Sequence, residues 1–204
     1  GDCREFSGST DGVGRGFTSI MTVDLLSEEF SSEVDHIASS WVEVYASGDM
    51  MVLAEPANDW WWFWRNNDYE DATNIHAFDI SVEGETSYIG SGRVTGTVQD
   101  QFSISEYNGD IRVASTTDSW GRWWLTEGGE WEVIEPQNHV TVLSPTECMI
   151  PEGCEDTSSE LVQIGYVGNI AEGERIWSAR FVGDLGYLVT FRNMDPLWTI
   201  DLSD

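Results

Sequence analysis

The feature that most constrains the fold is a unit of two short alternating strands joined by a Gly-Asp pair. Glycine adopts positive φ at no steric cost, so a Gly-Asp pair between alternating runs predicts a β-hairpin. The unit occurs at residues 41–55, 101–115 and 176–190, with its pairs at Gly48-Asp49, Gly109-Asp110 and Gly183-Asp184. Helical periodicity is scarce elsewhere, and we therefore expect an all-β chain with less than about a tenth of its residues in helix.

Further strands complete the unit. Segments with the alternation of strands occur at 17–27, 74–84, 138–147 and 196–204, and the first three are followed by short runs at 34–39, 86–94 and 161–169. The unit therefore has four strands, A to D, in which A and B are joined by the Gly-Asp turn. Four-stranded antiparallel units repeated along a chain predict a β-propeller, with each unit as one blade. A sandwich of two sheets is the alternative topology.

The blade repeats are not complete at either end of the sequence. We predict an N-terminal extension at 1–16 and a partial propeller at 17–204, with blade repeats near 17–38, 41–94, 101–167 and 176–204. Only the two middle repeats have all four strands. A propeller needs about four blades or more to close, so these roughly three blades are expected to be part of a larger ring. The remainder of the propeller, or another copy of the chain, would complete it.

Three stretches carry a resemblance to a known family. They are "GERIWSARFVGDLGYLVTFRNMDPLWTIDLSD" (173–204), "GSGRVTGTVQDQFSISEYNGDIRVAST" (90–116) and "TNIHAFDIS" (73–81). They resemble secreted bacterial and archaeal proteins with a C-terminal β-propeller that is distantly related to WD repeats. The resemblance implies the fold and a secreted, extracellular or cell-surface location, and it implies no reaction.

Tryptophan is concentrated in two segments that join strand B to strand C. Eight of the eleven tryptophans lie there: Trp60, Trp61, Trp62 and Trp64 in the segment 56–68, and Trp120, Trp123, Trp124 and Trp131 in the segment 116–138. Both B–C connections belong to the same face of a propeller. Three interpretations remain open: the segments pack on each other as a small core, they dock a partner, or they stack on sugar rings.

Arginine marks a second candidate site. Arg180 lies on a predicted innermost strand, where Ser178 shares its side and Ala179 and Phe181 take the other. Together with Arg192 and Asp195 it would form a channel ion pair, and a site for an anionic group is the alternative, because guanidinium binds carboxylates in a bidentate way.

Charge and cysteine content limit the partners and the compartment. With 37 acidic and 9 basic residues the net charge is −28, which would repel nucleic acid. No apolar run is long enough for a transmembrane segment. Cys148 and Cys154 flank a short loop and are expected to form a disulfide, leaving Cys3 unpaired within the chain. No cofactor is predicted, although calcium would suit so acidic a surface.

Catalytic motifs are not evident. The sequence has no G-x-S-x-G elbow, H-E-x-x-H pair or phosphate-binding loop. His76 and His139 occupy near-equivalent positions on predicted C strands, which indicates a structural role. We therefore favour a non-enzymatic extracellular binding or scaffold module, and a secreted protein that binds or degrades polysaccharide through its Trp-rich segments is the alternative.

Overall fold

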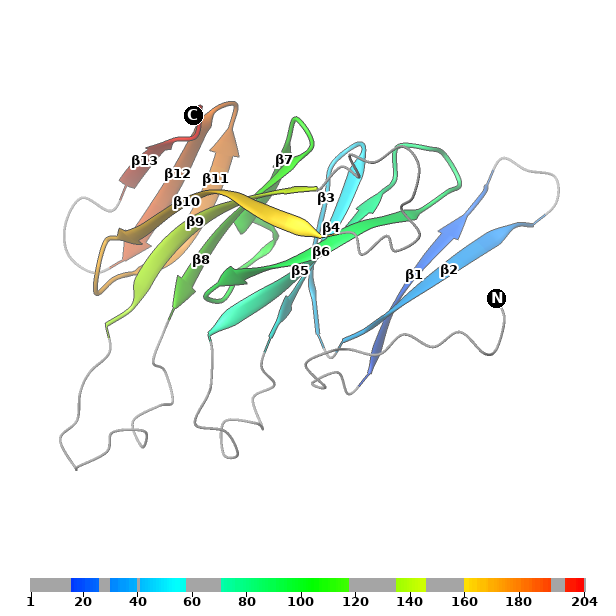
Figure 1. Ribbon diagram of the computed structural model, residues 1–204, viewed down its shortest axis with the longest axis horizontal. Helices are drawn as coiled ribbons and strands as arrows, with labels where there is room; N and C mark the ends of the chain where they lie inside the picture. Colours follow the sequence, from blue (N-terminus) through cyan, green and yellow to red (C-terminus); the bar gives the residue numbers. More distant parts are fainter. Residues whose placement is uncertain are drawn as a thin grey trace.

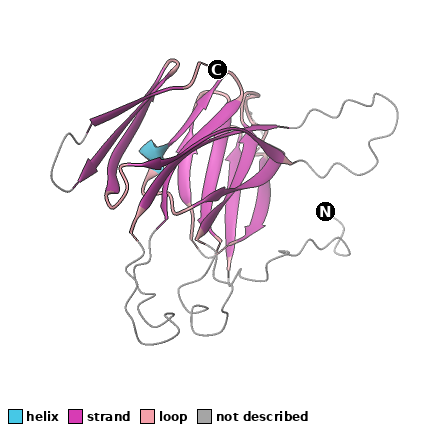
Figure 2. Cartoon of the chain, turned by 60° about the vertical axis from the view of Figure 1, so that its left-hand side comes forward, coloured by secondary structure: helices cyan, strands magenta, loops and turns pink. Residues whose placement is uncertain are grey.

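Strands dominate the described part of the chain. The structure is a computed structural model that describes residues 16–25, 30–39, 41–57, 71–117, 135–145, 160–191 and 197–203. Within these ranges the helical content is one 3₁₀ turn, η2 (Gln101–Ser103), which Figure 2 shows in cyan among the strands. The predicted all-β fold with little helix is confirmed for this part of the chain.

The described residues form thirteen strands in four antiparallel sheets. The first sheet has two strands, β1 (Phe17–Val23) and β2 (Ser32–Ala38). The second sheet is β3 (Glu43–Ala46), β4 (Met50–Pro56), β5 (Ala72–Asp79) and β6 (Ser87–Thr95). The third sheet is β7 (Ile104–Tyr107), β8 (Asp110–Thr117), β9 (Gln137–Pro145) and β10 (Leu161–Ile170). The fourth sheet is β11 (Arg175–Val182), β12 (Leu185–Phe191) and β13 (Leu197–Asp201).

In every sheet the strands lie in chain order, each paired with the next. This is the meander predicted for a propeller blade, in which the first strand is innermost. Figure 1 shows the sheets in sequence across the molecule, from β1 and β2 on the right to β11, β12 and β13 on the left. The arc does not close on itself in the described residues.

All three predicted A–B hairpins are present, but their turns differ in detail. Val182 pairs with Leu185, so Gly183 and Asp184 are the two turn residues as predicted. Tyr107 pairs with Asp110, so the second turn is instead Asn108-Gly109, with φ of 55° and 88°. A two-residue turn with positive φ at both positions matches the twist of the strands, and Asn-Gly is well suited to it.

The hairpin at Gly48 does not use positive φ. Gly48 is absent from the residues with left-handed backbone, and a Cβ atom built on it would meet nothing within 4 Å. The Ser47 hydroxyl instead accepts a hydrogen bond from the Met50 amide at 3.0 Å, and the Ser47 amide donates to the Met50 carbonyl at 2.8 Å. The expectation that each glycine supplies positive φ is therefore wrong at this turn.

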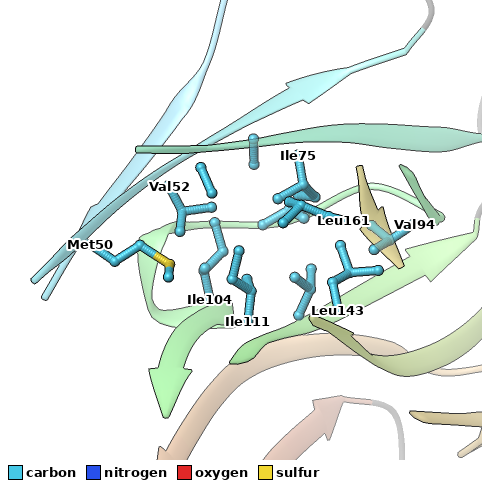
Figure 3. Close-up of a cluster of buried hydrophobic side chains, with 12 residues drawn as sticks. Met50, Val52, Ile75, Val94, Ile104, Ile111, Leu143 and Leu161 are labelled. Carbon is cyan, nitrogen blue, oxygen red and sulfur yellow. The ribbon is translucent and has the colours of Figure 1, made fainter. Parts of the chain in front are cut away.

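Two apolar cores hold the sheets face to face. The first core lies between the second and third sheets, where alternate residues of β4 and β5 meet alternate residues of β8 and β9; Figure 3 labels Met50, Val52, Ile75, Val94, Ile104, Ile111, Leu143 and Leu161. The second core joins the third sheet to the fourth and includes Ala114, Val140, Ile176, Ala179, Leu188 and Ile200. The third sheet is thus covered on both faces, as a blade inside a stack must be.

The second and third sheets approach closely at one glycine. A Cβ atom at Gly92 of β6 would lie 2.6 Å from the Leu161 carbonyl oxygen and 2.9 Å from the Leu161 Cβ atom of β10. The adjacent Ser91 forms a parallel bridge to Glu160. Glycine is required here because two backbones meet where a side chain would otherwise stand.

Both ends of the arc present apolar side chains to solvent. The face of the fourth sheet turned away from the second core carries Val182, Phe191 and Leu197, exposed by 65%, 73% and 62%. At the other end Phe17 and Met21 of β1 are exposed by 77% and 63%. Exposed apolar side chains that share one face are candidates for a contact surface.

Candidate binding site beside the innermost strands

The strands that flank the two Trp-rich segments end at one edge of the molecule. In Figure 1, β4 ends and β5 begins at the lower edge, where β8 also ends and β9 begins. Backbone hydrogen bonds of 2.9 and 3.1 Å join Thr97, just after β6, to Thr116 near the end of β8. The eight tryptophans predicted as a binding site lie outside the described residues: Trp60, Trp61, Trp62, Trp64, Trp120, Trp123, Trp124 and Trp131.

A pocket of about 120 Å³ lies at the same edge. Its walls come from the residues just before and at the start of β3, from the end of β4, and from the connection 97–99 between the second and third sheets. Trp41, Ala54, Pro56 and Val98 give it apolar walls, and Glu43 and Gln99 add polar groups. Ala54 and Val98 also belong to the first core, so the pocket reaches down to that core.

Two further indoles of this region are open to solvent, and the sequence interpretation overlooked them. Trp41 is 72% exposed and Trp177 is 66% exposed. Gln99 connects their surroundings, because it lines the pocket beside Trp41 and its Nε2 atom donates to the Trp177 carbonyl at 3.1 Å. The sequence signal that could have found them is position, because Trp41 and Trp177 begin or lie within predicted innermost strands and not in the Trp-rich segments.

Arg180 stacks on an aromatic ring. Its guanidinium carbon lies 3.7 Å from the centre of the Phe102 ring, and its Nη1 atom donates to the Ala179 carbonyl at 2.9 Å. Ala179 packs in the second core with Phe181 beside it, so Arg180 takes the opposite side of β11 as predicted. Arg192 and Asp195, the other members of the predicted channel ion pair, lie outside the described residues.

Among the arginines in the described ranges, a different one is buried. Arg112 of β8 is 4% exposed, and its guanidinium donates to the Gly183 carbonyl at 2.5 Å and to the Ser105 hydroxyl at 3.0 Å. Its guanidinium carbon lies over the rings of Tyr107 and Phe181, at 4.6 and 5.2 Å from their centres. Burial lowers the pKa of Arg112, and the nearby Tyr107 partly opposes this. The side chain joins the third sheet to the fourth.

Asn138 fixes the chain segment that connects the third sheet to the fourth. It is fully buried, and its Nδ2 atom donates to the carbonyls of Ile170 and Glu174 at 2.8 and 2.9 Å. Its Oδ1 atom accepts from the Thr116 hydroxyl at 2.7 Å and from the Ile176 amide at 3.2 Å. One side chain thereby fixes the path of the chain from β10 into β11.

The two histidines predicted to be structural lie on β5 and β9, the third strands of their sheets. His139 is 4% exposed, with its Nδ1 atom 2.7 Å from the Tyr166 hydroxyl and its Nε2 atom 3.2 Å from the Thr117 hydroxyl. Burial lowers the pKa of His139, which favours the neutral ring. The Nε2 atom of His76 lies 3.9 Å from the Glu55 carboxylate. Neighbouring strands hold the His139 ring on both sides, whereas the Nε2 atom of His76 is buried without a hydrogen-bond partner among the described residues.

All three cysteines, Cys3, Cys148 and Cys154, lie outside the described ranges, so the expected Cys148–Cys154 disulfide stays a prediction. Among the residues that the structure describes, no group of three or more His, Cys, Asp or Glu side chains could hold a metal ion. In the same residues no helix is long and apolar enough to cross a membrane.

Comparisons with known proteins agree with this architecture. A family model described as "Beta propeller domain" matches residues 1–204. An uncharacterized protein of Methanocaldococcus jannaschii is 29% identical over 145 residues, which cover 68% of this chain and 19% of that protein. An uncharacterized protein of Archaeoglobus fulgidus is 31% identical over 134 residues, which cover 66% of this chain and 16% of that protein. The chain thus matches less than a fifth of the length of either relative. No solved structure gives a significant match.

Proposed function

Because the chain belongs to the β-propeller domain family, we propose that it is a binding and scaffold module that forms one arc of a larger propeller outside the cell. The observation that carries this proposal is the pair of apolar end faces. The third sheet is covered on both faces, whereas the fourth sheet exposes Val182, Phe191 and Leu197 on the face that a next blade would cover. The remainder of the propeller, or another copy of the chain, is the proposed cover.

The length of the relatives supports this proposal. Each is several times longer than the region it shares with this chain, because the shared region is 19% or 16% of its length. Such proteins have room for the blades that the described arc lacks. A stacked array of sheets also gives a rigid frame on which loops at one edge are displayed, and binding residues are frequently found on loops held by such a frame.

The measurement that tests the proposal is the mass of the chain in solution, by light scattering at moderate salt. If the apolar end faces bind to another surface, the isolated chain should form species heavier than its 22.9 kDa monomer. A longer version of the protein that supplies the missing blades should then be a monomer with cooperative unfolding. A stable monomer of the isolated chain that unfolds cooperatively would contradict the larger-ring proposal.

A secreted or cell-surface location is part of the same proposal. It is supported by the net charge of −28, which keeps a protein soluble and discourages contact with nucleic acid. Fractionation of cells that produce the full-length protein tests the location. Recovery in the cytosolic fraction alone would contradict it.

Polysaccharide binding is the second candidate function, favoured by the exposed Trp41, which lines the pocket beside the end of β4, and by the exposed Trp177, whose carbonyl accepts a hydrogen bond from Gln99 of that pocket. Large amphipathic rings suit stacking on sugars. A glycan array tests this function, with Trp61→Ala and Trp124→Ala as variants. Loss of a glycan signal in either variant supports it, and a uniformly silent array leaves protein docking as the function of this edge.

A further inference from the structure

We infer that the pocket between Trp41, β4 and residues 97–99 binds one apolar side chain of a basic peptide segment in a partner protein. This inference rests on the proposed binding function and names the partner chemistry of one site.

The size of the pocket suits a single side chain. A water molecule occupies about 30 Å³ of liquid, so a pocket of about 120 Å³ has the volume of roughly four waters. Pockets for whole small molecules are larger, at about 300–1,000 Å³. A pocket of this size fits one leucine- or phenylalanine-like group, which is how an interface anchors its central residue.

The walls select an apolar group. Trp41, Pro56 and Val98 present carbon atoms to the pocket, and Ala54 continues that surface into the first core. The Thr73 and Thr97 hydroxyls, also in the lining, already donate to the Gly96 carbonyl and the Asp71 carboxylate. A sugar ring in this space would therefore find few partners for the many hydroxyl groups that lose water, which is unfavourable. An aliphatic or aromatic side chain loses nothing of this kind. The Trp41 ring, 72% exposed, can be covered by the remainder of the same ligand.

The rim favours a positive charge and a peptide backbone. Glu43 is the charged residue of the lining, and within the described ranges no side chain forms an ion pair or a hydrogen bond with its carboxylate. The chain as a whole carries a net charge of −28, which steers cationic partners toward it. Gln99 uses its Nε2 atom to bind the Trp177 carbonyl, so its Oε1 atom can accept a hydrogen bond from a peptide amide.

Peptide binding to the complete 204-residue chain tests the inference. The probes are short fluorescent peptides with leucine between two arginines, a matched peptide with alanine at the centre, and a matched peptide with glutamates as flanks. Fluorescence polarisation should give about tenfold tighter binding for the leucine peptide than for the alanine peptide. Because both peptides carry the same charge, this difference isolates the pocket from general attraction to an acidic protein.

Variants test whether the difference in affinity between the leucine and alanine peptides comes from the pocket. Trp41→Ala should bring the leucine and alanine peptides to the same affinity. Glu43→Gln should weaken both peptides alike and reduce the dependence of binding on salt. Trp198→Ala is the matched control, because Trp198 is a partly exposed indole on β13 of the fourth sheet and outside the pocket lining. Thermal unfolding confirms that each variant is folded.

Equal affinities of the unchanged chain for the leucine and alanine peptides would overturn the inference, as would a leucine preference that survives Trp41→Ala. Tight binding of the glutamate-flanked peptide would overturn the charge part. A glycan signal lost with Trp41→Ala, in the absence of a leucine preference, would assign the pocket to sugar instead. The mass in solution tests the scaffold proposal separately, so the inference about the pocket can be refuted while the scaffold proposal still holds.

Discussion

Replacement of Arg112 is the most informative perturbation of the arc, because this residue joins two sheets through a buried charge. Arg112→Ala removes two hydrogen bonds from a charged donor, to Gly183 and Ser105, each worth about 1.5–3 kcal/mol. It also removes contacts of the guanidinium with two aromatic rings. Against these losses, the variant no longer has to bury a charge, which costs several kcal/mol. We expect a net loss in the free energy of unfolding of about 3 kcal/mol.

Two further substitutions separate charge from shape. Arg112→Met fills most of the same space between Tyr107 and Phe181 without a buried charge, and we expect a loss of only about 1 kcal/mol. Arg112→Lys keeps the buried charge but loses the planar group that stacks on both rings and binds two acceptors at once. We therefore expect lysine to be worse than methionine, although it is the more conservative change in charge.

Urea and thermal unfolding measure these differences. For a chain of this size about 1 kcal/mol corresponds to a shift of roughly 2–4 °C in Tm, so alanine should lower Tm by about 6–12 °C. Hydrogen exchange at the Gly183 turn should rise in the alanine variant, since that turn is held through its carbonyl. The reasoning is refuted if lysine is tolerated while methionine is as damaging as alanine, because charge alone would then explain the site.

Three other substitutions follow from the same contacts, and urea unfolding measures each. Gly92→Ala should lose about 1–3 kcal/mol because its Cβ atom meets the Leu161 backbone, whereas Gly48→Ala, in open space, should be nearly neutral; equal effects would contradict the close approach of the second and third sheets. Asn138→Asp should lose about 3 kcal/mol, and more as pH rises, because the new carboxylate faces two carbonyl oxygens; a variant as stable as the parent would contradict this arrangement. Since burial lowers the pKa of His139, the folded parent resists protonation and should lose stability as pH falls below about 6.5. His139→Gln should lose less between about pH 7.5 and 5.5, and identical pH profiles would contradict a buried neutral ring.

The strand order could be predicted from the sequence because local signals define it. Each A–B hairpin carries a turn pair between two alternating runs, and an antiparallel meander needs no information about distant contacts. Even a turn that was misplaced by one residue, Asn108-Gly109 in place of Gly109-Asp110, left the pairing of β7 with β8 correct. The turn at Gly48 formed through the Ser47 hydroxyl, a local contact that the Gly-Asp pattern does not encode.

The buried cation and the pocket could not be predicted, since each depends on two sheets that meet. The sequence "DIRVAS" places Arg112 between apolar neighbours on an alternating strand, where the polar position is expected to face water. It is buried because the fourth sheet covers that face of β8. The pocket likewise depends on residues 97–99 passing between two sheets. Trp41 was detectable as a tryptophan just before an innermost strand, but a run of tryptophans elsewhere carried the stronger signal.

The uneven covering of the sheets sets an order in which parts of the arc open. Neither core cluster of the described residues contains a side chain from β1 or β2, whereas the third sheet contributes to both. In a linear stack each sheet is stabilised by its immediate neighbours, so local unfolding should begin at the ends and reach β8 and β9 last. Amide exchange should therefore be fastest in β1 and β2. A partner that covers the first sheet would slow that exchange without touching the middle of the stack, which makes the exchange rate of this hairpin a direct reporter of ring completion.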